Sequence, residues 1–141
     1  KHFLSLCGEH LSVDNMNKSI DIVSEELGLT IKEFTVTGIE HESLFAHHWF
    51  IGVEETHVDS ALIRNKLDAT LAQLNDDYAV ERQHALKDIF VTILPNDVFY
   101  GWMADKGKMG GQNKFPRVLK NTQRTEWTDY LTKKGIDPII T

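Results

Sequence analysis

The residues of this 141-residue chain that are best suited to chemistry lie in one basic segment, residues 106–124. It contains six cationic side chains, no acid, and glycines at positions 107, 110 and 111. The cations are Lys106, Lys108, Lys114, Arg117, Lys120 and Arg124. The whole chain has 15 basic and 21 acidic residues, so the remainder is strongly acidic. Lysines beside a glycine run, on an acidic body, are typical of a site that meets an anion.

The second half of this basic segment is predicted to be stiffer than the first. Pro116 biases Phe115 toward an extended backbone, so Lys114 and Arg117 flank a defined piece of chain. A lysine in such a place can bring a point charge to a phosphate or carboxylate and withdraw it again. The alternative interpretation is a solvated connection between two helices, whose lysines only aid solubility.

Neither standard phosphate-binding template fits the glycines. A P-loop would need glycine at position 102 and a hydroxyl residue at 109, where the chain has Trp102 and Met109. The dinucleotide spacing G-x-G-x-x-G is also absent. A stand-alone module that binds anions or nucleic acid through the basic segment stays open, since Trp102, Phe115 and Trp127 could stack on bases. The acidic remainder disfavours it, because counterion release needs a broad basic face.

Several histidines near glutamates raise the question of a metal site; these residues are His41, His47, His48, His57, Glu40 and Glu42. His47 and His48 are neighbours on an expected strand, so their side chains should point to opposite faces of the sheet. Zinc sites need a defined ligand set, and we therefore expect structural histidines and no metal centre. Nucleophilic catalysis has equally little support, because Cys7 has only His10 nearby in sequence and no G-x-S-x-G elbow occurs.

The composition is that of a globular protein with one domain. Hydrophobic residues make up 41% and charged residues 26%, which excludes a disordered or membrane-embedded chain. The single cysteine excludes a disulfide framework and fits a reducing compartment, so we predict a cytoplasmic protein. No apolar run reaches membrane-spanning length, and no signal-peptide pattern opens the chain. The abrupt start at Lys1, without methionine, predicts a fragment of something longer.

Hydrophobic periodicity predicts alternating strands and helices. The expected strands cover about 2–7, 30–39, 46–54 and 89–94, and the expected helices about 14–27, 59–75, 78–86, 96–106 and a last one after 121. Ser12 or Asp14 should cap the first helix, and Gly28 should end it. Asn121 should cap the last helix.

This order of elements predicts an α+β or mixed α/β fold, with one mixed sheet of about four strands flanked by helices. The strand at 46–54 carries apolar residues on both faces, since Trp49 and Ile51 alternate with Phe50. It should therefore be covered on both sides.

Residues Lys106 to Arg117 read Lys-Gly-Lys-Met-Gly-Gly-Gln-Asn-Lys-Phe-Pro-Arg. This stretch resembles the C-terminal signature of the auxin-responsive-promoter family, the plant acyl acid–amido synthetases that conjugate auxin or jasmonate to amino acids, and their bacterial relatives. The likeness also covers residues 3–11, 47–51 and 67–82, so it spans most of the chain in the family's order. The piece from Gln112 to Arg117 is its most specific part, and the chain is more similar to the bacterial members.

The resemblance implies that residues 1–141 are the C-terminal cap domain of a larger adenylate-forming enzyme. In that superfamily a large N-terminal domain, absent here, binds ATP, Mg²⁺ and the acyl acid, and the cap swivels between adenylation and acyl transfer to an amine. The lysine that approaches the nucleotide matches Lys114, and Gln112 and Arg117 are further candidates for contacts with the ATP or AMP phosphates. The Lys114 ammonium would stabilise charge on acyl-phosphate and pyrophosphate oxygens. The cap alone should be inactive.

The same resemblance places a hinge at Gly8, Glu9 and His10, within a leading strand and hinge formed by residues 1–13. Plant members commonly carry an acid–lysine pair at this entry, where the present chain has Glu9-His10. A contact made by the plant lysine is therefore not transferred to His10. The implied partners are the N-terminal domain of the same chain and small-molecule acyl acid and amino acid substrates, with no nucleic acid and no membrane.

Overall fold

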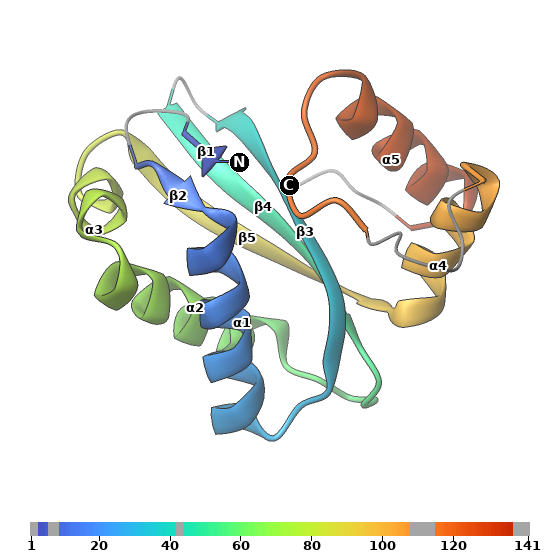
Figure 1. The fold of residues 1–141 in the computed structure, drawn as a ribbon, viewed down its shortest axis with the longest axis horizontal. Helices are drawn as coiled ribbons and strands as arrows, with labels where there is room; N and C mark the ends of the chain where they lie inside the picture. Colours follow the sequence, from blue (N-terminus) through green and yellow to red (C-terminus); the bar gives the residue numbers. More distant parts are fainter. Residues whose placement is uncertain (1–2, 6–8, 42–43, 108–114, 137–141) are drawn as a thin grey trace.

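The computed structural model describes residues 3–5, 9–41, 44–107 and 115–136 (Figure 1). The elements in these ranges alternate between strands and helices along the chain. They are β1 (Phe3–Leu4), β2 (Leu11–Ser12), α1 (Val13–Leu27), β3 (Ile31–His41), β4 (Leu44–Val53), α2 (Ser60–Leu74), α3 (Asp76–Arg82), β5 (Leu86–Pro95), α4 (Asn96–Asp105) and α5 (Thr122–Lys133). No helix in these ranges is both long and apolar enough to cross a membrane.

Strand β4 is the centre of a mixed sheet with the order β3-β4-β5. It pairs antiparallel with β3 and parallel with β5. Every residue from Ala46 to Val53 is buried. The prediction that this strand is covered on both faces is confirmed, since only a central strand between two layers buries successive side chains.

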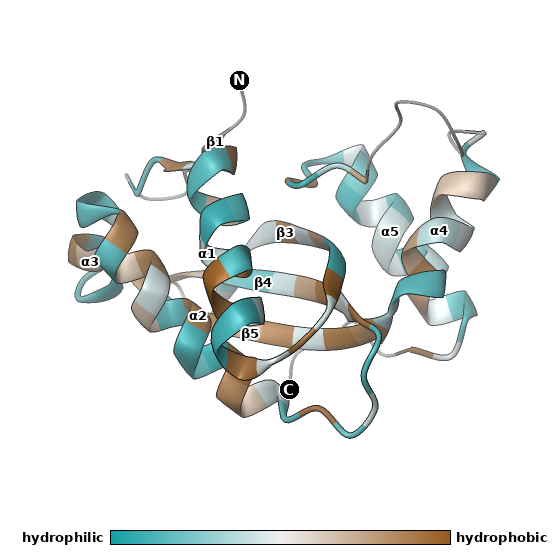
Figure 2. Cartoon of the chain, turned by 60° about the horizontal axis from the view of Figure 1, so that its bottom comes forward, coloured by the Kyte–Doolittle hydropathy of each residue, from teal (hydrophilic) through white to brown (hydrophobic). Residues whose placement is uncertain are grey.

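Two hydrophobic cores lie on opposite faces of the sheet. Helices α1, α2 and α3 cover one face, where Met16 and Leu67 pack with Trp49. Helices α4 and α5 pack at the other, where Phe99 and Trp127 surround Phe50 (Figure 1). In Figure 2 hydrophobic residues dominate β5, while hydrophilic residues recur along the helices. Because β-strand side chains alternate, Trp49 and Phe50 each serve a different core.

Local signals set the ends of α1 as predicted. Ser12 is its N-cap and forms a capping box: the Ser12 hydroxyl accepts from the backbone of Asn15, and the Asn15 side chain accepts from the backbone of Ser12. Gly28 ends the helix at φ +67°, a left-handed conformation that glycine adopts without a steric penalty. Asn121 does precede α5, but its side chain makes no capping hydrogen bond. Its φ of +54° departs from the extended backbone that normally aims a capping side chain at the helix.

The predicted helix at 78–86 is displaced in the structure. Helix α3 already begins at Asp76, because the Asn75 side chain accepts from the backbone N–H of Tyr78 and starts a new helix there. Strand β5 begins at Leu86, where helix was expected. The Arg82 guanidinium donates to the carbonyl oxygens of Leu86 and Lys87, which holds the chain as it turns into the strand.

The mixed α/β fold class is confirmed, with a smaller sheet than the four strands expected. The leading strand predicted at 2–7 is the two-residue β1, which pairs with β2 instead of joining the sheet. A single parallel bridge between Val36 and Val118 adds a short extended segment beside β3. That segment immediately follows the glycine-containing half of the basic segment.

Candidate functional site

The basic segment is described in the structure only at its two ends. Lys114 and Gln112, the leading candidates for phosphate contacts, lie outside the described residues, as do Lys108 and Gly8. The site is therefore built from the side chains that fix positions 105–107 on one side and 115–120 on the other.

Phe115 anchors the C-terminal end. Its side chain is only 2% exposed. Its ring centroid lies 5.0 Å from those of Phe99 and Trp102, and 4.9 Å from that of Trp127. Aromatic pairs at such distances stabilise beyond the area they bury. Residue 115 is thus held between α4 and α5, and Lys114 is attached in sequence to a fixed point.

Residues 116–119 run along the edge of β3. The Val36 N–H donates to the Arg117 carbonyl over 2.9 Å, and the Leu119 N–H donates to the Val36 carbonyl over 3.0 Å. These two bonds fasten the segment on both sides of Val118. Pro116 directly precedes this paired stretch, and the extended backbone predicted for Phe115 stays a prediction.

Arg117 is engaged by β3. Its guanidinium donates to the Glu33 carboxylate over 2.8 Å and to the Phe34 carbonyl over 3.1 Å, and it lies 4.3 Å from the centroid of the Phe34 ring. A planar, permanently charged fork is well suited to this combination of partners. The geometry makes Arg117 an anchor of the segment. Contact with nucleotide phosphates, which would require Arg117 to exchange Glu33 for a phosphate, stays a prediction.

The N-terminal end is also fixed. Lys106 follows α4, pairs with Glu126 of α5 and lies 5.4 Å from the centroid of the Trp102 ring. Gly107 then turns the chain at φ +71°. Lys106 and Arg117 are therefore both matched with carboxylates, which leaves the basic segment less available for a broad anion surface than its composition indicates.

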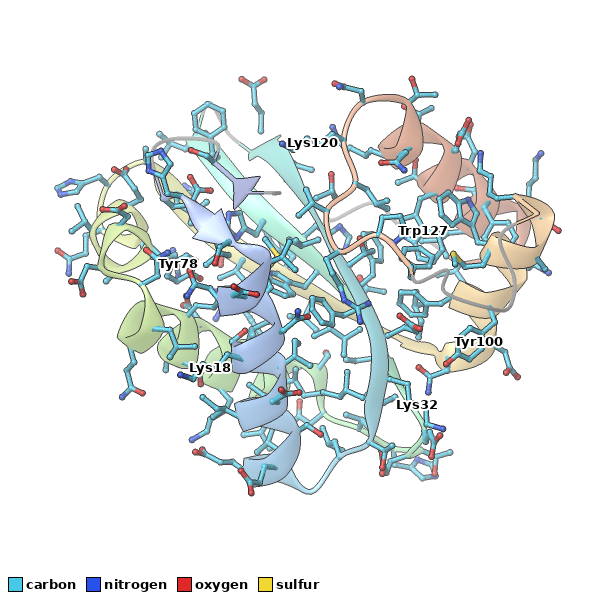
Figure 3. All side chains as sticks on the ribbon, viewed as in Figure 1. Lys18, Lys32, Tyr78, Tyr100, Lys120 and Trp127 are labelled. Carbon is cyan, nitrogen blue, oxygen red and sulfur yellow. The ribbon has the colours of Figure 1, made fainter. Side chains whose placement is uncertain are left out.

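A shallow hollow joins this segment to the start of α1. Val13 lines it on one side, and residues 116–118 with Lys120 and Gln123 line the other. Lys120 lies on the loop that leads into α5 (Figure 3). The structure thus brings the entry of the domain, near residue 13, next to the most family-specific stretch of the sequence.

The predicted hinge residues have unlike environments. The Glu9 side chain is fully buried, and its carboxylate lies 2.8 Å from Nε2 of His47, itself fully buried. His10 is exposed, has φ +47°, and its Nδ1 lies 3.6 Å from the Asp77 carboxylate. The Glu9–His47 contact joins residues 38 positions apart, and no local sequence spacing could have signalled it.

The two adjacent histidines of β4 point to opposite faces, as predicted. His47 faces the layer of α1, α2 and α3, and its ring centroid lies 5.9 Å from that of Tyr78 in α3. His48 stacks on Phe50 at 4.0 Å, and its Nε2 lies 2.7 Å from Oγ1 of Thr92. Within the described ranges, which leave out Glu42, no three His, Cys, Asp or Glu side chains gather closely enough to hold a metal ion.

Burial sets the charge state of His48. The side chain is 4% exposed, and burial, with a smaller contribution from Arg124, lowers the pKa of His48 to about 4. Its imidazole is therefore neutral at pH 7. This neutral ring packs on Phe50, at the core formed with α4 and α5, where a charged ring would lack solvation.

Acidification should consequently weaken the fold through His48. The unfolded side chain titrates near pH 6.5, so between pH 6.5 and 4 the unfolded state binds more protons and stability falls as the pH falls. The loss is about 1.4 kcal/mol per pH unit at most, or roughly 3 kcal/mol across the window. We expect His48→Gln to remove this part of the slope in urea unfolding measured from pH 4 to 7. Exposed His84 gives the control variant His84→Gln, which should keep the wild-type slope; equal slopes for all three proteins would contradict the assignment.

A partly buried network of side chains supports α3. Arg82 donates to both carboxylate oxygens of Asp68 over 2.9 Å, and the Tyr78 hydroxyl donates to Asp68 over 2.5 Å. Burial alone would raise the pKa of Asp68, but the hydrogen bonds from Arg82 and Tyr78 outweigh it and lower the pKa. Burial raises the pKa of the Tyr78 phenol, which stays protonated and donates. These three residues lie in the part of the sequence, 67–82, that resembles the family.

The fold and the site are those of a small mixed α/β domain whose cationic segment is fixed at one end by Phe115 and at the other by the pairing of Lys106 with Glu126. A family model described as the GH3 family C-terminal domain matches residues 14–123. The chain therefore belongs to the GH3 family and is its C-terminal domain. This agrees with the resemblance drawn from the sequence, while the bacterial affiliation stays a prediction.

Solved structures with the same fold include those titled "GH3.15 acyl acid amido synthetase" and "AtGH3.15 acyl acid amido synthetase in complex with 2,4-DB". The TM-scores are 0.74 and 0.71, at 15% and 16% sequence identity. Each match covers 94% of this chain but 25% of the other, so the chain spans about a quarter of the length of these proteins. A comparison with curated proteins finds no match.

Proposed function

We propose that this chain is the cap domain of an ATP-dependent acyl acid–amido synthetase, which adenylates a carboxylic acid and transfers the acyl group to an amine. The family match over residues 14–123 supports this, together with solved acyl acid amido synthetases of which the chain covers a quarter. The remaining three quarters of such an enzyme would supply the sites for ATP, Mg²⁺ and the acyl acid. The cap by itself would be inactive.

The observation that carries the proposal is the anchoring of Phe115. Residue 114 precedes a side chain that is buried among three aromatic rings and followed by a segment hydrogen-bonded to β3. A cation attached to such a base can be presented at a reproducible place when the cap meets the nucleotide-binding domain. Preorganised charge of this kind costs little reorganisation when charge develops on phosphate oxygens.

Lys114 would be the catalytic residue, and its neighbours would have supporting roles. The Lys114 ammonium would stabilise charge on the acyl-phosphate and pyrophosphate oxygens during adenylation. Gln112 would add a neutral hydrogen bond to the same phosphates. Arg117, bonded to Glu33, would hold the base of the segment and could reach a phosphate only by leaving that carboxylate.

Lys114→Ala in the full-length enzyme tests the assignment. We expect acid-dependent pyrophosphate exchange to fall by about a hundredfold or more, since removing one donor that stabilises transition-state charge costs 10²–10³ in rate. Lys114→Arg should retain part of the rate, because it keeps the charge with a different geometry. Undiminished exchange in Lys114→Ala would remove Lys114 from the mechanism.

Lys108→Ala is the matched control, because Lys108 lies in the glycine-containing half of the same segment. Its exchange rate should stay within about threefold of wild type, as expected for a solvated charge. If Lys108→Ala loses as much as Lys114→Ala, the segment acts through its summed charge. Salt-dependent binding of the chain to an oligonucleotide, without any exchange activity in the full-length protein, would instead support a stand-alone nucleic-acid-binding module.

A further inference from the structure

Glu9 is a charged residue in a connecting segment, yet none of its side chain is exposed to solvent. Its carboxylate lies 2.8 Å from Nε2 of His47, whose side chain is equally inaccessible. A carboxylate removed from water is strongly unfavourable unless a partner compensates it. The contact therefore fastens the chain between β1 and β2 to the central strand of the sheet.

His47, the hydrogen-bond partner of Glu9, is itself held in place by other side chains. His47 lies on β4, and its ring packs against the ring of buried Tyr78. The Tyr78 hydroxyl donates to the Asp68 carboxylate, and Arg82 donates two further hydrogen bonds to it. A rigid donor makes the Glu9 contact specific, because the neighbours of His47 fix the position of the ring nitrogen that meets the carboxylate.

The backbone next to Glu9 is fastened by independent contacts. The Asn75 side-chain amide donates to the His10 carbonyl over 3.2 Å and to the Asn15 side chain over 3.0 Å. Leu11 is fully buried in the core that α1, α2 and α3 form with the sheet, and Ser12 caps α1. Residues 9–12 are thus attached to β4, to α1 and to the junction of α2 and α3.

We infer that Glu9 and His47 are positioning residues that keep residues 9–12 part of the cap while it changes orientation. This inference rests on the proposed function and on the two orientations of the cap that the family resemblance implies. Strand β1 pairs with β2, so residues 3 and 4 belong to the same fastened piece, and the pivot of the rotation lies outside residues 9–12. Glu9 and His10, placed in the hinge by the resemblance, would move with the cap as a rigid piece.

Positioning makes a different prediction from fold stabilisation alone. If the pair only stabilised the fold, its loss would reduce adenylation and acyl transfer in the same proportion, through the folded fraction. If it fixes the pivot, its loss loosens the link between the domains, and the half-reaction that follows the rotation should suffer more. The ratio of the two rates therefore separates the two roles.

The experiment compares Glu9→Ala and Glu9→Gln in the full-length enzyme with wild type. For Glu9→Ala we expect amide hydrogen exchange at Leu11 and Ser12 to be about tenfold faster, with exchange at Ile51 of the central strand unchanged. Amide formation should fall about fivefold or more relative to pyrophosphate exchange. Glu9→Gln keeps a hydrogen bond to His47 and should stay near wild type in both measurements.

Glu25→Ala, which removes an exposed acid on α1, is the control and should change neither measurement. Unchanged amide hydrogen exchange at residues 11 and 12, or an unchanged ratio of amide formation to pyrophosphate exchange, would overturn the inference. A wild-type enzyme that catalyses neither half-reaction would overturn the proposed function, and the pivot with it. The rates of amide hydrogen exchange would then still decide whether Glu9 fastens residues 9–12.

Discussion

Replacing Phe115 with alanine is expected to destabilise the domain by about 3–5 kcal/mol, the usual cost of deleting a buried aromatic side chain. The ring is 2% exposed and contacts the rings of Phe99, Trp102 and Trp127. Its removal opens a cavity between α4 and α5 that rigid indole rings cannot easily refill. Chemical denaturation of the chain should show the loss as a lower midpoint with an unchanged slope.

The same substitution should reduce adenylation beyond its effect on folding. Phe115 is the first fixed residue after Lys114, so its loss lets the base of the segment move. Under conditions where the variant is fully folded, pyrophosphate exchange by the full-length enzyme should still fall by about tenfold, because small misplacements of a catalytic group are costly.

Two controls separate anchoring from general damage. Phe115→Leu keeps an apolar anchor and should lose less of both stability and exchange than Phe115→Ala. Leu62→Ala removes a side chain that is 52% exposed and should change the free energy of unfolding by less than about 0.5 kcal/mol. A folded Phe115→Ala enzyme with wild-type exchange would show that Lys114 does not depend on this anchor.

The parts of the fold that local chemistry controls were predictable. Ser12 and Gly28 bound the first helix because one accepts from the helix backbone and the other adopts a left-handed conformation. The apolar residues on both faces of the strand at 46–54 required a central position between two layers. Pro116 indicated a defined stretch of chain after it, and Arg117 and Leu119 bond to the backbone of β3 there.

The parts that depend on contacts between distant residues were not predictable. Leu86 follows a helical pattern, but Arg82 holds its carbonyl and β5 begins there. Glu9 is an ordinary surface residue by type, and only the folded chain brings it to His47. Arg117 was assigned to phosphates by resemblance, and no sequence pattern indicated that Glu33, 84 positions away, would bind it.

Asp68→Ala is expected to destabilise the domain by about 2–4 kcal/mol. Removing the acid leaves the Arg82 guanidinium and the Tyr78 hydroxyl without their shared partner, and breaking a buried pair from one side is strongly unfavourable. The range is reduced from the fully buried case because both charged side chains are about one-fifth exposed. Urea unfolding at pH 7 gives the measurement.

The pH dependence of the same variant gives a second measurement. The pKa of Asp68 is lowered in the folded state, so its contribution is present above the ordinary carboxyl value of 3.8 and is lost as the pH falls through the folded pKa. The difference in unfolding free energy between wild type and Asp68→Ala should therefore shrink in acid. Asp68→Asn keeps the shape and one acceptor and should lose about half as much at pH 7.

Asp21→Ala supplies the matched control, since Asp21 is an exposed acid on α1 and its removal should change stability by less than about 0.5 kcal/mol. An equal effect for Asp21 and Asp68 would mean that net charge, not the Tyr78–Asp68–Arg82 network, stabilises the domain. Because Tyr78 packs against His47, the network also supports the hydrogen-bond partner of Glu9. Asp68→Ala should therefore speed amide exchange at residues 11 and 12 as well, and protection there equal to wild type would show that the Glu9 contact is independent of the network.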